Sequence, residues 1–147
     1  MRVTFAHLCD YATVSKEGKL SVLGIFSTIS VSQIPARHAQ MFLAFELELE
    51  PLELNHDFNI EIRCRDADGG PVFAIQGTMN LEGQAKPGQK PRIGQTVQLT
   101  NTEFRRPGDY DVTIQISGRV EATVPFSVIE RQKDDPPPQI GNRPPNG

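Results

Sequence analysis

The fold is decided by residues 109–128, which read DYDVTIQISGRVEATVPFSV. Apolar side chains occupy every second position on both sides of Gly118, which is the period of a strand with one buried face. A three-residue loop centred on Gly118 would join two such strands into a hairpin with all its apolar side chains on one face. The predicted pairs are Ile116 with Val120, Ile114 with Ala122, and Tyr110 with Phe126.

A tight turn is predicted directly before this hairpin, at Arg106-Pro107-Gly108-Asp109. Proline fixes φ at its second position, and glycine accepts the left-handed conformation. Tyr110 follows at the start of the penultimate strand, which resembles the tyrosine corner of immunoglobulin-like and fibronectin-like sandwiches. Further on, a proline at 125 cannot donate to a ladder, so it predicts a sheet edge or a bulge.

Two earlier segments, 41–50 and 58–66, alternate in the same way. The first has an apolar face and an acidic face, which is typical of a half-buried strand. If the two strands pair across the connection between them, Leu47 lies opposite Ile62 and Glu46 opposite Arg63. The alternative is that these consecutive strands belong to different sheets. The acidic face carries Glu46, Glu48 and Glu50, with Glu53 and Glu61 nearby.

The remaining strands are less regular. Strands are predicted over 71–79 and 95–104, after a glycine-rich turn at 66–70 and around a loop at 82–94. Near the N-terminus, alternate positions from Val3 to Tyr11 share one face. The segment 20–26 is apolar on both faces, so both are expected to be covered, by the core and by the N-terminal segment or another subunit.

These elements predict an all-β domain: an antiparallel β-sandwich of 8–9 strands with immunoglobulin-like, Greek-key character. Tryptophan, which antibody domains carry in the core, does not occur in the sequence. The domain is expected to span 1–130. Residues 131–147 contain five prolines and one aliphatic residue, which predicts a disordered tail.

Composition restricts the class of protein. The chain has 147 residues and a net charge of −3, which disfavours nucleic acid as a partner because such binding requires cationic neutralisation of phosphates. No segment has the roughly 20 apolar residues that span a bilayer, so no membrane association is expected. The first residues lack the apolar core of a signal peptide. We therefore expect a cytoplasmic protein in which both cysteines are reduced.

Motifs at the two ends of the domain resemble a bacterial protein family of unassigned function, over about residues 3–129. They comprise Asp10-Tyr11-Ala12, Glu17-Gly18-Lys19-Leu20 leading to Leu23-Gly24-Ile25-Phe26, Phe104 with Pro107-Gly108-Asp109-Tyr110, and Pro125-Phe126-Ser127-Val128. The resemblance implies a β-sandwich and a bacterial source. It implies no activity, so it assigns no functional residue.

Chemical motifs favour structural roles. Cys9 and Cys64 share apolar parity and are expected to be buried thiols, with a disulfide as the alternative. His7 lies on the same strand face as Cys9, but further ligands at metal-site spacing are missing. Asp66-Ala-Asp68-Gly69 resembles the start of a calcium loop without its later ligands, and a hairpin turn is favoured. The glutamates are expected to form a solvated exterior. The sequence thus predicts no catalytic residue, metal or cofactor.

Lys86, Lys90 and Arg92 give the 82–94 loop a local positive charge. Loops of this length are usually functional or disordered. The sequence leaves two interpretations: a flexible loop, or a contact loop for an acidic partner in which these three residues bind.

Three functions follow from these observations. The favoured one is a non-enzymatic interaction or structural module that binds a protein partner or a second copy of itself, because the segment 20–26 is apolar on both faces. The alternative is a small-ligand domain, for example for a carbohydrate, that uses the loops at one end. An enzyme is the least favoured, since the sequence offers no catalytic constellation.

Overall fold

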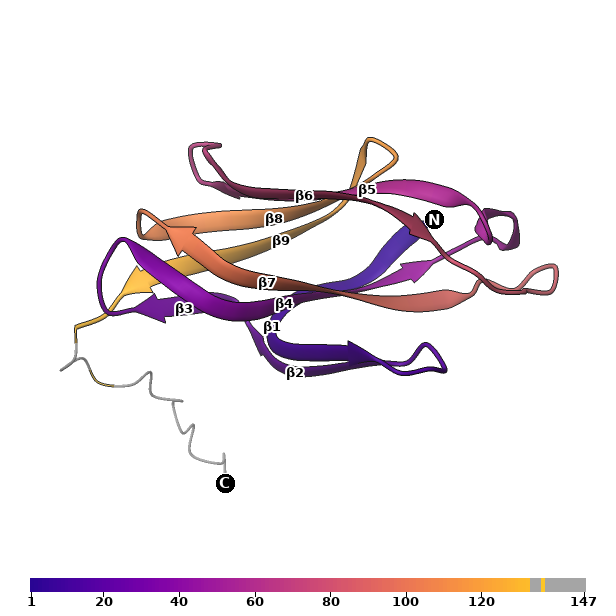
Figure 1. Cartoon of the computed structure of the whole chain (residues 1–147), viewed down its shortest axis with the longest axis horizontal. Coiled ribbons are helices and arrows are strands. Elements are labelled where there is room, and N and C mark those ends of the chain that lie inside the picture. Colours follow the sequence, from indigo (N-terminus) through magenta and orange to yellow (C-terminus); the bar gives the residue numbers. More distant parts are fainter. Residues whose placement is uncertain (133–135, 137–147) are drawn as a thin grey trace, which may run out of the picture.

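The computed structural model describes residues 1–132 and 136. Its described residues form nine strands in two facing sheets, and one short 3-10 turn, η1 (Pro51–Glu53), joins β4 to β5 (Figure 1). The all-β prediction is confirmed. The predicted tail over 131–147 lies outside the described residues except for 131, 132 and 136. The strands are β1 (Arg2–Val14), β2 (Leu20–Phe26), β3 (Thr28–Val31), β4 (Ala36–Glu48), β5 (Asp57–Asp66), β6 (Pro71–Asn80), β7 (Arg92–Phe104), β8 (Gly108–Ile116) and β9 (Arg119–Glu130).

One sheet has the order β2-β1-β4-β7 and the other β3-β9-β8-β5-β6 (Figure 1). The chain changes sheet five times: between β2 and β3, β3 and β4, β4 and β5, β6 and β7, and β7 and β8. Neighbouring strands are antiparallel except for β3 and β9, which run parallel. Nowhere in the described chain is there a helix with the length and apolarity needed to cross a membrane.

The conditional pairing of segments 41–50 and 58–66 is wrong. β4 and β5 belong to different sheets, because η1 turns the chain across the sandwich after Glu50. β4 pairs along its length with β7, which places Glu46 opposite Gly94. Leu47 and Ile62 therefore contribute to one core from opposite layers.

The core lies between the sheets and consists of the side chains that alternate inward. On β4, Leu43 and Leu47 are completely buried and Phe45 is 1% exposed, as the period of the sequence predicts. The other inward strands contribute in the same way. Further buried core residues are Leu8, Ile29, Met41, Leu49, Leu54, Ile62, Cys64, Leu81, Leu99, Phe104, Tyr110, Val112, Ile114, Ile116, Val124, Phe126 and Val128.

The β8–β9 hairpin is confirmed, with one correction at its tip. Tyr110 pairs with Phe126 and Ile114 with Ala122 as predicted, but Ile116 pairs with Arg119 and not with Val120. Both turn residues, Ser117 (φ 51°) and Gly118 (φ 81°), have positive φ, as a two-residue type I′ turn requires. The register shift between Ile114 and Gln115 absorbs the difference.

Tyr110 forms the predicted corner contact. Its hydroxyl donates a hydrogen bond to the backbone carbonyl of Arg106 at 2.6 Å, and its ring packs against those of Phe104 and Phe126 at 5.1 and 5.4 Å. Pro125 also lies where expected, since β3 accompanies β9 only from Ser127 onward. The missing proline N–H therefore falls on a part of β9 with an open edge.

The β1–β2 hairpin folds back over the outer face of its own sheet. β2 and β7 are separated by two strands in the sheet order, yet a Cβ at Gly94 of β7 would stand only 2.8 Å from Leu20 Cβ. A second, smaller core lies beneath the hairpin, on the face opposite the main core. It consists of Cys9, Ala12, Phe42 and Ala44, with Phe5, Leu20 and Val22 at its border.

This fold-back corrects the predicted pattern near the N-terminus. The single shared face from Val3 to Tyr11 is wrong, because β1 has a register shift between Val3 and Phe5. Leu8 and Cys9 are both completely buried, one in each core. Gly24 has a positive φ of 67°, so β2 is not a continuous extended strand either.

Candidate functional site

Three large apolar side chains are exposed together on the β1–β2 hairpin. Tyr11 is 48% exposed, Leu23 65% and Ile25 53%. Tyr11 lies directly across from Leu23, and Ile25 is two positions further along β2. We call these three residues the hairpin surface. Leu20 and Val22 pack inward while Leu23 and Ile25 do not, so within the described chain the N-terminal segment does not provide the second cover expected for segment 20–26. Cover by another subunit stays a prediction.

The hairpin surface rests on a fixed support. The Tyr11 ring meets Phe42 edge-on at a centroid distance of 5.3 Å and an interplanar angle of 70°. This is a favourable aromatic geometry, and it joins the exposed hairpin to the buried second core. The position of the Tyr11 ring is therefore set by the fold of the chain itself.

A groove of about 440 Å³ continues from the hairpin surface to the open part of β9. Ile25 belongs to both, so the exposed apolar side chains lead into the groove without interruption. The opposite wall comes from β9, beside Pro125, where the side of that strand away from β8 has no described neighbour. The lining residues are Ala6, His7, Ile25, Phe26, Ser27, Thr123, Val124 and Pro125.

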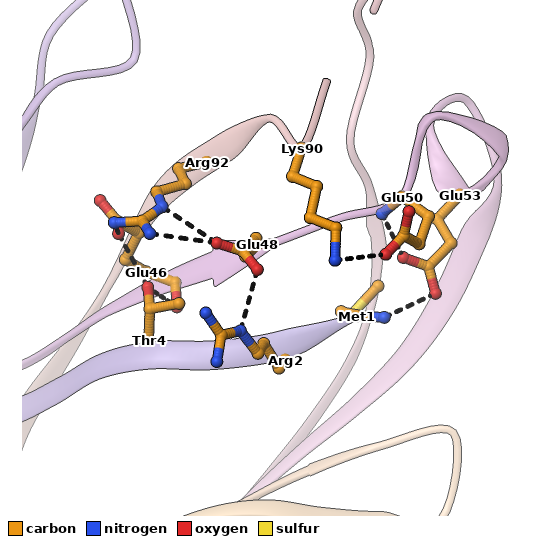
Figure 2. A network of polar contacts seen from close by, with 9 residues as sticks. All are labelled: Met1, Arg2, Thr4, Glu46, Glu48, Glu50, Glu53, Lys90 and Arg92. Atoms are coloured by element: carbon orange, nitrogen blue, oxygen red, sulfur yellow. Dashed lines mark hydrogen bonds and ion pairs between the residues drawn. The ribbon is translucent and has the colours of Figure 1, made fainter. Parts of the chain in front are cut away.

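A charged network covers another part of the same sheet (Figure 2). Glu48 lies between two arginines: Arg2 Nε donates to its Oε1 at 2.9 Å, while Arg92 Nε and Nη2 both stand 3.1 Å from its Oε2. The Glu48 residue is only 8% exposed, so this part of the predicted solvated exterior is buried. The hydrogen bond from Arg2 lowers the pKa of the Glu48 carboxyl, against the opposing effect of burial.

The other glutamates of this face are also engaged. Glu46 accepts a hydrogen bond from Thr4 Oγ1 at 2.7 Å and lies 3.7 Å from Arg92 Nη1. Glu53 accepts the N-terminal amine at 2.8 Å, and its other oxygen accepts the Glu50 backbone N–H at 2.8 Å (Figure 2). Such pairing neutralises the acidic strand and gives the carboxylates structural partners.

Two of the three predicted binding residues take part in this network. Lys90 Nζ pairs with Glu50 Oε1 at 3.1 Å, and Arg92, predicted in the loop, is the first residue of β7 and pairs with Glu46 and Glu48 (Figure 2). Lys86 is exposed in the loop, where its backbone N–H donates to Gln89. The structure thus brings Lys90 and Arg92 onto one acidic face and separates Lys86 from them. Contact with an acidic partner stays a prediction.

Both cysteines are buried free thiols, as predicted. Cys9 lies in the second core and its thiol is 3.6 Å from the Phe42 carbonyl oxygen, whereas Cys64 lies in the main core. Burial raises the pKa of Cys64 to about 12 and also raises that of Cys9. His7 instead packs its ring against Phe5 at 4.8 Å. Within residues 1–132, no three His, Cys, Asp or Glu side chains are grouped to hold a metal.

The end of the sandwich away from the charged network carries a polar hollow of about 430 Å³ (Figure 1). Asp66 forms the predicted hairpin turn, because its Oδ1 accepts the backbone N–H groups of Asp68 and Gly70 at 3.0 and 2.7 Å. Arg106 lies in the turn between β7 and β8 and connects it to the Asp66 turn through ion pairs with Asp68 at 3.2 Å and Asp66 at 3.9 Å. The lining residues are Asp66, Gly70, Pro71, Val72, Glu103, Arg105, Arg106 and Tyr110.

Fold and surface define a small β-sandwich domain with an apolar hairpin and an internally paired charged face. The chain belongs to the family of unknown function DUF6941, whose model matches residues 4–129. The predicted resemblance to a family of unassigned function is confirmed. No curated protein matches the chain.

Among solved structures, one similar chain is that of Pseudomonas fluorescens alkylpurine DNA glycosylase AlkC bound to DNA containing an abasic site analog. It is 14% identical, with a TM-score of 0.40, and the match covers 70% of this chain and 27% of the glycosylase. The chain therefore spans about a quarter of that protein's length. A likeness at this level says nothing about function.

Proposed function

We propose that this chain is a non-enzymatic protein-interaction domain of the bacterial cytoplasm, and that the hairpin surface with its adjoining groove is where a partner binds. The exposure of Tyr11, Leu23 and Ile25 side by side is the observation that carries the proposal. Contiguous exposed apolar surface on a folded domain marks interaction sites more often than scattered apolar residues do.

The partner is a protein with an apolar surface. Binding hot spots are typically large side chains in well-packed pockets surrounded by contacts that exclude water. An apolar side chain of the partner would enter the 440 Å³ groove beside Ile25, while flatter apolar contacts cover Tyr11 and Leu23. The support of Tyr11 by Phe42 keeps this surface ready for binding.

The condition of the reactive groups supports a role in binding over one in catalysis. Glu48 is held between Arg2 and Arg92, and the thiols of Cys9 and Cys64 are buried with raised pKa values. A thiol with a pKa near 12 is protonated at neutral pH and is a poor nucleophile. These groups are already engaged in stabilising the fold.

The test starts with a photo-reactive amino acid in place of Leu23 in living cells, with the same substitution at Val120 as the matched control. Val120 is 56% exposed and lies on the distant β8–β9 hairpin, so both probes are comparably accessible. A partner cross-linked at position 23 and not at 120 is then purified, and its affinity for the intact chain is measured by calorimetry.

Leu23→Asp places a charge where the apolar contact forms and should weaken that affinity about 30-fold or more, as loss of a hot-spot residue of about 2 kcal/mol does. Val120→Asp should leave it unchanged. Equal cross-linking at both positions, or a Leu23→Asp variant that binds as tightly as the intact chain, would show that the hairpin surface is not the contact.

A small-ligand domain remains the second candidate, and the polar hollow of about 430 Å³ beside Asp66 and Arg106 is the observation that favours it. Arg106 and Asp66 would contact a small polar or charged ligand there. Tyr110 lines the hollow but is only 6% exposed, so it offers little platform for stacking a sugar. A thermal-shift screen with polar metabolites and sugars tests this function, since a true ligand raises Tm and Arg106→Ala abolishes the shift.

A further inference from the structure

β6 is an open sheet edge without a charged residue. It forms one border of the five-stranded sheet, and its ten residues, Pro71–Asn80, read PVFAIQGTMN. Its backbone groups on the side away from β5 have no strand partner among the described residues. Natural edges usually carry lysine, inward-pointing charges or a covering segment, because an open edge pairs readily with another strand.

The middle of this edge is hollow on both faces at Gly77. A Cβ at this position would meet only Ile60 Cγ2, at 4.0 Å, so the space beside Gly77 is open. On the core side lies a hollow of about 360 Å³, bordered by Ile75, Met79 and Val97. On the outer side lies one of about 480 Å³, bordered by Gln76 and other polar residues.

The missing side chain at Gly77 lies beside an apolar one that is exposed. Ile75 is two positions away on the same face and 39% exposed, although its neighbour across the strands, Ile62, is 2% exposed. β6 therefore carries, on one face, a protruding apolar side chain and a gap that is bordered by apolar side chains. In an antiparallel pair of such strands, the protruding Ile75 of each strand could fill the gap at Gly77 of the other strand.

We propose that β6 is a homodimerisation edge, at which a second copy of this chain adds its own β6 antiparallel about a two-fold axis through Gln76. In this register Ile75 lies opposite the partner's Gly77, and Gly77 opposite the partner's Ile75. Phe73 lies opposite the partner's Met79, and Gln76 opposite the partner's Gln76. Both gaps are then filled at once, as a two-fold interface requires.

Alternative registers are less favourable. A shift by one residue would turn the core-side face of one strand to the outer side of the other, because side chains alternate with period two. A two-fold axis through Gly77 would leave both gaps empty, and one through Ile75 would oppose the two protruding side chains. The absence of charge on β6 means that self-pairing brings no like charges together.

The size of the contact sets the expected affinity. The paired stretch from Phe73 to Met79 is about 24 Å long at ~3.4 Å per residue and one strand wide. A contact of that length and width buries an area well below the roughly 800 Å² per partner of a standard stable interface. The dimer is therefore of the weak, transient class, with a Kd on the order of 10 µM to 1 mM.

Sedimentation equilibrium of the full chain from about 10 µM to 1 mM tests this inference. The intact chain should dimerise with concentration. Gln76→Lys places two like charges opposite each other at the axis, on the outer face of an exposed edge where folding tolerates them, and should weaken dimerisation at least tenfold. The matched control is Gln98→Lys, which makes the same change at an exposed position of β7, the edge of the other sheet.

Charge complementation then tests the register itself. Gln76→Lys and Gln76→Glu should each be largely monomeric, and their equimolar mixture should regain dimer, because the opposed residues now attract. A monomer at 1 mM, unchanged association of Gln76→Lys, or no recovery in the mixture would overturn the proposal. Association lost in Leu23→Asp but kept in Gln76→Lys would place self-association on the hairpin surface and would also overturn it, while leaving the proposed function standing.

Discussion

Replacing Gly94 by alanine should lift the β1–β2 hairpin off its sheet. The added Cβ would stand 2.8 Å from Leu20 Cβ and 3.5 Å from Leu20 Cα. Carbon atoms in contact prefer about 3.5–4.0 Å. Both opposing atoms are fixed to the backbone, so no rotamer change of Leu20 relieves the overlap. The hairpin must therefore move, which loosens the packing of Phe42 beneath it.

The expected loss follows from two opposing effects. Overpacking a well-packed site costs about 1–3 kcal/mol. Replacing a glycine by alanine at a compatible backbone position returns about 0.4–1 kcal/mol, because the unfolded chain becomes less flexible. The net free energy of unfolding should fall by about 1–2 kcal/mol. Gly77→Ala is the matched control: its Cβ meets nothing nearer than 4.0 Å, so it should be neutral or stabilising.

Urea unfolding at micromolar protein concentration measures both variants. With an m-value of about 2 kcal/mol/M, a loss of about 1–2 kcal/mol should lower the midpoint of Gly94→Ala by about half a molar to one molar. Hydrogen exchange should speed up in β1 and β2 and remain unchanged in β8 and β9. If Gly94→Ala is as stable in urea as the intact chain or more stable, or if Gly77→Ala loses as much free energy of unfolding, then Leu20 does not pack on Gly94 and the fold-back is refuted.

Three further predictions concern single groups. Tyr110→Phe leaves a backbone carbonyl without its hydrogen bond and should cost about 1–2 kcal/mol in urea unfolding, whereas an unchanged midpoint would mean that the corner contact contributes nothing. The hydrogen bond from Arg2 lowers the pKa of Glu48 in the folded state, so the contribution of Glu48 to the free energy of unfolding is present at neutral pH and is lost as the pH falls through the folded pKa. Glu48→Gln should therefore flatten the acid side of a profile of stability against pH. An equally steep profile would contradict this. Cys9 and Cys64 should resist alkylation in the native state at pH 8 and react fully in urea, and rapid native labelling would contradict their burial.

Alternation was sufficient to predict the strands that pack on one core. Tyr110 and Phe126 pair as expected because the period of two and the turn residues specify the same hairpin. The exception at its tip, where Ile116 pairs with Arg119, depends on the conformation of Ser117. A serine with positive φ is uncommon, and the sequence does not distinguish a two-residue turn with a bulge from a three-residue loop.

The charged site was only partly predictable. The glutamates of β4 and the cations Lys90 and Arg92 are visible in the sequence, but their pairing requires that β7 lie beside β4. Strand order depends on contacts between distant parts of the chain, which local patterns do not encode. Ile93 has the same parity as Val97 and Leu99, which was a usable signal that β7 begins earlier than position 95.

The apolar composition of the hairpin surface is visible in the sequence, but its exposure is not. The apolar character of both faces of β2 was correctly observed, and the inferred second cover was not found in the described chain. The fold-back depends on Gly94, whose missing side chain makes room for Leu20. A single glycine in a strand has several explanations, so its role was evident only in three dimensions.

The parallel pairing of β3 with β9 constrains the order in which the domain assembles. Ile29 pairs with Val128, which lies about three-quarters of the domain later in the sequence, and within the described chain β9 is the one strand adjacent to β3. During synthesis β3 can therefore pair only after β9 has left the ribosome. Such distant closures slow folding, since chain entropy is lost before the contacts form. A chain truncated before β9 would leave β3 and one side of β8 unpaired, so β9 is the strand that completes this sheet of the sandwich.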